Sequence, residues 1–194
     1  MKTRITLLLI ILLVFMAEVK SQNSTSENKF DMKLNIKAGI GAALTNYTDV
    51  GITSFVTATA ELPLTKNQRW NVNVGARFRN DNIFDYGQVK LADKAHYSAG
   101  RLEIPAIFSY DQPIYKNAFL RFNFGVYYSQ LLFQTVEKEI SPSNIHQFIF
   151  DSGVECGISF MLNNFYISLD YDILIDMVYT GPINNIRTGF GFRF

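Results

Sequence analysis

The chain has a single cysteine, Cys156, among its 194 residues. A lone cysteine excludes an internal disulfide and any cysteine-rich zinc site. Charged residues are also scarce, at 18% of the chain against about 25% in an average globular protein. The 18 basic side chains nearly balance the 17 acidic ones. This balance argues against a nucleic-acid-binding protein, which would present a basic face, so no nucleic acid is expected among the partners.

Long hydrophobic runs are absent apart from one at the N-terminus. Lys2 and Arg4 precede a run of thirteen residues, 5–17, that is apolar except for Thr6. That run is shorter than the ~20 residues that cross a bilayer as a helix, and it has the length of a signal-peptide core. We therefore predict a cleavable signal peptide over 1–21, with a short membrane anchor as the alternative. No later stretch reaches 18 apolar residues, so no transmembrane helix is expected.

Apolar and polar residues alternate along nearly all of the remaining chain. In residues 31–44, for example, Leu34, Ile36 and Ile40 fall on even positions, whereas Lys33 and Lys37 fall on odd ones. A period of two indicates a strand with one apolar and one polar face. The pattern predicts eight strands, over 31–44, 52–62, 70–79, 101–110, 120–129, 150–160, 165–176 and 186–194.

The predicted connections alternate in length. The longer ones cover 45–51, 80–99, 133–147 and 178–185, and the shorter ones cover 63–69, 111–117 and 162–164. Long loops at one end and short turns at the other are typical of outer-membrane β-barrels, whose short turns face the periplasm. An even number of strands then places both chain termini on the periplasmic side.

The charged residues of these strands all fall on the polar face. Eight acids and eight bases cancel there: Asp31, Glu61, Glu103, Asp151, Glu155, Asp170, Asp172 and Asp176 against Lys33, Lys37, Arg77, Arg79, Arg101, Arg121, Arg187 and Arg193. A closed interior requires such balance because an unpaired buried charge is costly, whereas a solvated face does not. We therefore predict an ion-pair network inside the barrel. The alternative is a soluble barrel, with the apolar face inward.

Glycines and aromatic residues also support a barrel with its polar face inside and its apolar face outside. Eight of the 12 glycines share the polar face, where they would make room for Arg or Tyr side chains of neighbouring strands. Large aromatic residues lie near the strand ends of the apolar face, as in the girdles at the lipid headgroup level: Trp70, Phe78, Tyr110, Phe122, Tyr128, Phe160 and Phe165. Eight strands leave an interior wide enough only for side chains or one small ligand, so we expect a plugged interior and no open pore.

The sequence thus predicts an all-β fold, an eight-stranded antiparallel up-and-down transmembrane β-barrel preceded by a cleavable signal peptide. The expected divisions are the signal peptide (1–21), a short periplasmic tail (22–29) and the barrel (30–194). The expected location is the outer membrane of a Gram-negative cell.

Two segments resemble known outer-membrane barrels. The end of the chain carries Phe190, Phe192 and Phe194 at every second residue, and it resembles the C-terminal strand that the barrel assembly machinery recognises. The segment 101–108, Arg-Leu-Glu-Ile-Pro-Ala-Ile-Phe, resembles a strand of the PorT-like barrels of Bacteroidota, within the OmpA-like eight-stranded superfamily. That family pattern has Tyr where this chain has Arg101. The Gln at position 22, after the expected cleavage site, also resembles that phylum.

Candidates for chemistry are few. The only histidines are His96 and His146, and His96-x-Ser98 resembles the His-x-Ser of lipid A deacylases, although a nucleophilic serine also needs an orienting acid. Asp81, Asn82 and Asp85 could offer oxygen ligands to Ca²⁺, but their spacing is irregular. Three carboxylates lie on one face of a predicted strand: Asp170, Asp172 and Asp176. They could form a paired-carboxylate site, or they could instead form ion pairs with the bases of the same interior.

No catalytic, cofactor-binding or metal site is therefore expected. The resemblance to PorT-like barrels, some of which are implicated in type IX secretion and gliding, implies a non-enzymatic accessory of envelope assembly or protein secretion. Its expected partners are outer-membrane lipid, the barrel assembly machinery and secretion-system components. Two alternatives remain open, namely a surface adhesin or receptor that uses the outer loops, and a lipid A-modifying enzyme that uses His96 and Ser98.

Overall fold

The structure is a computed structural model that describes residues 32–45, 50–84, 95–138, 143–144, 150–176 and 181–194. The predicted signal peptide (1–21), the tail (22–29) and Asp31 lie outside these ranges. Within them, no helix is long and apolar enough to span a membrane.

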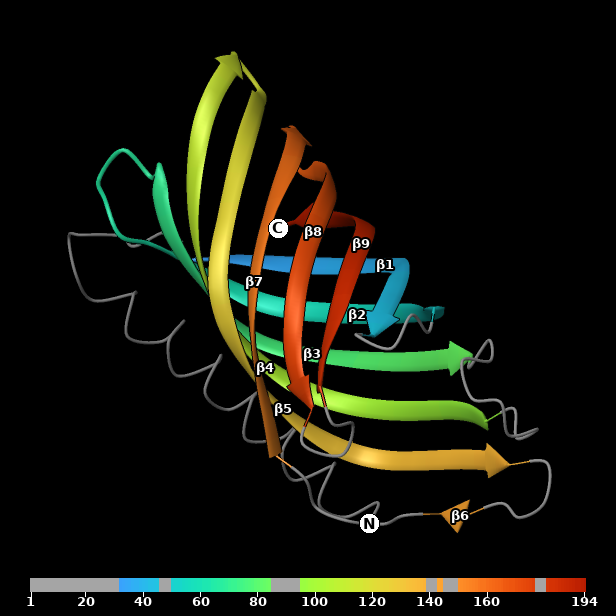
Figure 1. The fold of residues 1–194 in the computed structure, drawn as a ribbon. Helices are drawn as coiled ribbons and strands as arrows, with labels where there is room; N and C mark the ends of the chain where they lie inside the picture. The colour runs from blue at the N-terminus through green and yellow to red at the C-terminus, as the bar shows by residue number, and fades with distance from the viewer. Residues whose placement is uncertain (1–31, 46–49, 85–94, 139–142, 145–149, 177–180) are drawn as a thin grey trace.

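Eight long strands form the described part of the chain. They are β1 (Lys33–Thr45), β2 (Val50–Pro63), β3 (Trp70–Phe84), β4 (Ala95–Tyr115), β5 (Ala118–Lys138), β7 (Phe150–Leu162), β8 (Phe165–Asp176) and β9 (Gly181–Arg193), and a two-residue strand, β6 (Ser143–Asn144), pairs with β5. All pairings are antiparallel, β1 pairs with β9, and β4 pairs with β5. The sheet therefore closes on itself, which confirms the predicted eight-stranded barrel (Figure 1).

The register shows how the sheet closes. One circuit of paired residues starts at Leu34 and returns to β1 at Leu44, passing through Ala60, Val74, Ala106, Val126, Val154, Ile173 and Asn184. The start and the end of this circuit lie ten residues apart on the same strand. Such a stagger requires strands that tilt against the barrel axis, and in Figure 1 the strands β1–β3 accordingly cross β7–β9 of the opposite wall steeply.

Side chains alternate between the interior and the outer wall as a period of two requires. Arg77 and Arg79 on β3 are fully buried, whereas Phe78 between them is 43% exposed. Every Asp or Glu whose side chain the structure describes is buried. Most large apolar side chains of the strands point outward and their paired charges point inward, so this barrel has its apolar face outside, unlike the soluble alternative.

Four strands run at least five residues further than the sequence predicted, and one of them, β9, begins at Gly181 and not at 186. β3 continues to Phe84, while β4 and β5 each span 21 residues. The predicted strands were shorter, 70–79, 101–110 and 120–129, because the apolar alternation stops at those bounds. Backbone pairing needs no apolar side chain, and the ladder continues to the pairs Phe84–His96 and Ala95–Lys138. The predicted loops 80–99 and 133–147 are shortened accordingly.

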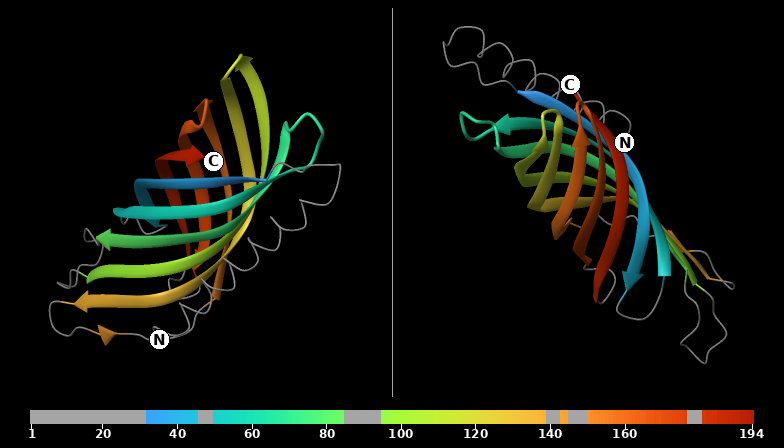
Figure 2. Two further views of the ribbon diagram at one scale, coloured as in Figure 1. Left: turned by 180° about the vertical axis from the view of Figure 1, so that it is seen from behind. Right: turned by 90° about the horizontal axis from the view of Figure 1, so that it is seen from above.

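The short turns and the two ends of the barrel sequence lie at one end of the barrel (Figure 2). Leu34 at the start of β1 and Phe194 after β9 exchange backbone hydrogen bonds of 3.1 and 2.8 Å. In the β7–β8 turn, Asn163 has a φ of 54°, a left-handed conformation that asparagine tolerates better than most residues. Its backbone N–H donates to the carbonyl of Asn117 in the β4–β5 turn at 2.8 Å, so adjacent turns support each other.

Candidate functional site: the charged interior

Charged side chains from all eight long strands meet inside the barrel. They arrive there because inward positions recur at every second residue of each strand. Away from water, each charge must find an opposite partner, since an isolated buried charge is strongly unfavourable. The interior pairs them in two groups, one near the short turns and one in the middle of the barrel.

The first group, the short-turn cluster, consists of Glu61, Asp111, Arg121 and Arg193. Arg121 Nη1 lies 2.6 Å from Glu61 Oε2, and Arg121 Nε lies 2.5 Å from Asp111 Oδ1. Its guanidinium thus binds two carboxylates through both of its edges, a geometry that suits arginine and not lysine. Arg193 Nη1 adds a contact of 3.3 Å to Glu61, whose Oε2 also accepts a hydrogen bond from Asn35 at 2.9 Å.

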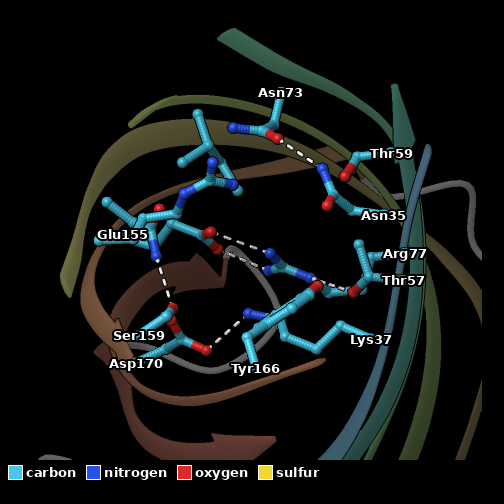
Figure 3. Close-up of a pocket in the computed structure, with 13 residues that line it drawn as sticks. Asn35, Lys37, Thr57, Thr59, Asn73, Arg77, Glu155, Ser159, Tyr166 and Asp170 are labelled. Carbon is cyan, nitrogen blue, oxygen red and sulfur yellow. Dashed lines mark hydrogen bonds and ion pairs between the residues drawn. The ribbon is translucent and has the colours of Figure 1, made fainter. Parts of the chain in front are cut away.

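The second group, the central network, begins at Arg77. Its Nη1 lies 3.1 Å from Glu103 Oε2 and 2.6 Å from Glu155 Oε2, and its Nε donates to Thr57 Oγ1 at 3.2 Å. Glu155 is also paired with Arg187 at 3.1 Å. These residues come from β2, β3, β4, β7 and β9, so the network joins opposite walls (Figure 3).

The central network continues from Arg79 toward the long-loop end. Arg79 contacts three carboxylates, Asp81 at 3.0 Å, Glu103 at 2.9 Å and Asp172 at 3.1 Å. The Tyr127 hydroxyl donates to Asp172 Oδ2 at 2.7 Å. At the outer edge of the network, Arg101 pairs with Asp151 and lies 3.7 Å from Asp81. Arg187 lies in the middle of the network, 2.9 Å from Asp172 and 3.1 Å from Glu155.

A small polar cavity of about 40 Å³ lies between the two groups. Its lining includes Arg77, Tyr166 and the ion pair of Lys37 with Asp170, whose Nζ and Oδ2 atoms are 2.7 Å apart. Figure 3 shows these side chains pointing into the barrel from opposite walls. A polar space of this size accommodates a few water molecules and is far below the volume of ordinary ligand pockets.

The interior becomes apolar toward the long-loop end. A layer of inward side chains there is 0–3% exposed: Ala43, Ile83, Ala99, Leu131, Leu174 and Ile183. Tyr127 belongs to the same cluster and touches the charged residues through its hydroxyl. Because these side chains exclude water, the layer seals the central network from the outer end of the barrel.

Two inward glycines are required by large neighbours. A Cβ on Gly153 would collide with the Tyr127 ring, and one on Gly191 would lie 2.5 Å from Tyr166 Cζ. The two tyrosines therefore occupy the space that the missing side chains leave, which is the packing role that the sequence suggested for these glycines.

Thirteen of the predicted network residues form ion pairs in the interior: Lys37, Glu61, Arg77, Arg79, Arg101, Glu103, Arg121, Asp151, Glu155, Asp170, Asp172, Arg187 and Arg193. Lys33 lies instead at the short-turn rim, where its Nζ donates to Gln68 Oε1 at 2.8 Å. Asp31 and the side chain of Asp176 lie outside the described part of the structure.

Two carboxylates were assigned to connections and belong to the interior. Asp81, expected in an outer loop, is fully buried on β3, and Asp111, expected in a turn, is 5% exposed on β4. Both continue the odd-numbered, inward positions of their strands. That parity could have identified them, but no apolar residues alternate with them to reveal the strand.

The other chemical candidates gain no catalytic geometry. His146 and the side chain of His96 lie outside the described part, and Glu103 faces the interior, paired with Arg77 and Arg79. Asp81 binds Arg79 and so is not a calcium-loop ligand. The structure pairs Asp170 and Asp172 with bases. Among the described residues, no group of three or more His, Cys, Asp or Glu side chains is placed to hold a metal.

The aromatic residues at the end of the chain lie on the outer wall. Phe190, Phe192 and Phe194 are 57%, 49% and 68% exposed, and the Phe192 ring lies 5.4 Å from that of Phe165. The three side chains are therefore accessible from outside the barrel, toward its short-turn end. Their role as an assembly signal stays a prediction.

Comparison with known proteins supports the fold. No family model and no curated protein matches the chain. Among solved structures, the Neisserial surface protein NspA is similar with a TM-score of 0.52 and 16% identity, over 84% of this chain and 97% of that one. The N-terminal β-barrel domain of Pseudomonas aeruginosa OprF gives 0.47 and 14%, and the attachment invasion locus protein Ail of Yersinia pestis gives 0.46 and 11%, each over 84% of this chain, and over 97% and 98% of theirs. The likeness to NspA shows the fold of an eight-stranded outer-membrane β-barrel.

Proposed function

We propose that this chain is a non-enzymatic outer-membrane β-barrel that acts through partners bound at its ends and not through its interior. The observation that carries the proposal is the closed interior, in which ion pairs fill the middle of the barrel and an apolar layer covers them. The cavity between the two groups of ion pairs has a volume of only about 40 Å³. Such an interior offers a solute neither a path nor a binding pocket.

The proposed placement follows from the outer wall. Apolar side chains cover it, including Ile40 at 62%, Phe124 at 64% and Leu169 at 60% exposure. Exposure of so much apolar surface to water is unfavourable, whereas the hydrocarbon core of a membrane solvates it. The short turns and both chain ends would then face the periplasm, and the long connections would face the cell exterior.

The finer proposal is an accessory role in envelope assembly or protein secretion, as in PorT-like barrels. The motif that resembles that family, 101–108, occupies the middle of β4, where Leu102 and Ile104 face outward and Glu103 joins the central network. Glu103 bridges Arg77 and Arg79. The motif is thus built into the wall, which supports a role for it in the stability of this barrel and leaves partner binding to the ends.

A second candidate is a surface adhesin or receptor. It is favoured by a change from apolar to polar outward residues at the long-loop end of β3 and β4. On β3, Asn80 and Asn82 follow Phe78, and on β4 the outward residue near this end is Ser98. Polar outward side chains indicate that the sheet of β3, β4 and β5 rises out of the membrane at that end. The long-loop ends of β3, β4 and β5 would then lie beyond the lipid surface, where a partner could reach them.

A deletion strain separates the two candidates. We expect its secreted and surface proteomes, quantified against wild type, to lose a class of cargo whose precursors are retained in the periplasm. Complementation with a variant whose 85–94 and 139–142 connections are shortened should restore export. Unchanged export in the deletion strain would contradict the accessory role, and loss of extracellular binding with the shortened variant would support the adhesin.

Two further measurements test the negative parts of the proposal. The refolded barrel should give no stepwise ion current in planar lipid bilayers, because the apolar layer blocks the axis. A His96→Ala strain should have the same lipid A mass spectrum as wild type. A steady conductance would refute the closed interior, and a changed lipid A spectrum would establish the enzymatic alternative.

A further inference from the structure

The rim of the barrel at the short-turn end carries only positive charge among the described side chains outside the short-turn cluster. Lys33, Lys66, Arg69 and Lys116 lie there, and none of them forms an ion pair with a described carboxylate. The acids nearest this end, Glu61 and Asp111 of the short-turn cluster, are inside the barrel and bound to Arg121. Among the described residues, the carboxylates near this end are therefore paired inside the barrel, and none of them neutralises the lysines and the arginine at the rim.

Three of these cations gather at one turn. Lys66 and Arg69 belong to the β2–β3 turn (64–69), and Lys33 joins it through its hydrogen bond to Gln68 Oε1. The turn has a defined shape, since Leu64 N donates to the Trp70 carbonyl at 2.7 Å and Gln68 N donates to the Thr65 carbonyl at 2.9 Å. The cations therefore project from an ordered turn.

The same turn adjoins the aromatic girdle. Trp70 follows Arg69 directly, is 49% exposed on the outer wall, and its ring centroid lies 4.8 Å from that of Tyr110. Leu64 at the other end of the turn is 53% exposed. Tryptophan and tyrosine at the end of a lipid-facing wall lie at the headgroup level of the bilayer. Arg69 and its neighbours are thus placed at the depth of lipid phosphates.

We propose that Lys33, Lys66 and Arg69 form a binding site for the phosphate of an anionic phospholipid in the periplasmic leaflet. The cations would bind the headgroup, while Leu64 and Trp70 contact the first part of its acyl chains. This proposal rests on the membrane placement proposed above. Lipid is favoured over an acidic protein because the site combines charge with apolar surface at the edge of the lipid-facing wall.

Lys116 provides a matched control. It is exposed and lies at the tip of the β4–β5 hairpin, which reaches beyond the other turns (Figures 1 and 2). Tyr115, which is 79% exposed, lies five positions beyond Tyr110 of the girdle. Lys116 has the same charge as Lys66. At that distance from the girdle, we expect it to lie outside the headgroup layer.

The test is lipid binding by the purified full-length barrel, measured by native mass spectrometry after release from nanodiscs. The nanodiscs contain equal amounts of phosphatidylglycerol and phosphatidylcholine with the same acyl chains. We expect wild type to retain phosphatidylglycerol preferentially. The triple variant Lys33→Gln, Lys66→Gln, Arg69→Gln should lose at least about tenfold of that preference, since each cation near an anionic surface contributes severalfold to binding. Lys116→Gln should remain within about twofold of wild type.

Folding is checked independently by the mobility of unboiled protein on gels, so that every result can be interpreted. A folded wild type without preference, or a folded triple variant that keeps it, would overturn the headgroup site and leave the barrel proposal intact. An equal loss in Lys116→Gln would mean a diffuse charge effect and would also overturn the site. Failure of wild type to enter nanodiscs would instead refute the membrane placement itself, and the site with it.

Discussion

The ion pairs of Arg77 allow a quantitative test of the interior. Arg77 is fully buried, with Glu103 at 3.1 Å and Glu155 at 2.6 Å. Removing one partner of a buried pair costs roughly 3–5 kcal/mol because the remaining charge is left without compensation. After Arg77→Met, however, Glu103 keeps Arg79 at 2.9 Å and Glu155 keeps Arg187 at 3.1 Å. We therefore expect the lower end of this range, a loss of about 3 kcal/mol in the free energy of unfolding.

The assay is guanidinium unfolding of the barrel from phospholipid vesicles. The only tryptophan of the chain, Trp70, lies half exposed on the outer wall and reports its transfer from lipid to water. Linear extrapolation gives the free energy in the absence of denaturant. The exposed control Lys116→Met should change it by no more than about 0.5 kcal/mol, as surface substitutions usually do.

A double variant tests the reasoning about pairing. Because Glu155→Gln removes one of the charges that Arg77→Met leaves under-compensated, the two losses should not add. We expect a coupling energy of about 1 kcal/mol or more, which is within the range for residues in direct contact. A loss below about 1 kcal/mol for Arg77→Met, or strictly additive variants, would show that the central network does not stabilise the barrel in this way.

Three other substitutions or labels test the assignment of inside and outside. Val154→Arg, on the outer wall, should lower the fraction of unboiled protein that migrates as a folded barrel, at a cost of about 2–4 kcal/mol at the bilayer midplane; normal assembly would contradict a lipid-facing wall. Gly153→Ala drives a methyl group against the Tyr127 ring and within 2.6 Å of the Ile173 carbonyl oxygen, so the unfolding titration should show a loss of about 1–3 kcal/mol, and no loss would mean that Tyr127 lies elsewhere. A fluorophore on the exposed Cys156 should be quenched by brominated lipid and not by aqueous iodide; the opposite pattern would place it in water.

The errors of the sequence prediction share one physical origin. Asp81 and Asp111 continue the inward positions of β3 and β4, yet they were assigned to connections. Hydrophobic alternation reports only where one side of a strand meets lipid, and hydrogen bonding extends the strand beyond that point. Wherever both sides of a strand are polar, as at 80–82 on β3, the sequence looks like a loop although the ladder continues.

Much of the architecture follows from the sequence alone, because a strand has an exact side-chain period of two. That period assigned Phe78 to the outer wall and Arg77 and Arg79 to the interior, and the balance of charge on one face indicated that this face is enclosed. The number of long strands follows from the same pattern.

The tertiary structure alone decided which charges pair. Arg77 on β3 meets Glu155 on β7, 78 residues away, and Lys37 meets Asp170, 133 residues away. These partners depend on the ten-residue stagger of the closed barrel, which no single strand encodes. The separation of the interior into two ion-pair groups and a covering apolar layer likewise exists only after closure. It depends on the level along the barrel axis at which each inward side chain lies.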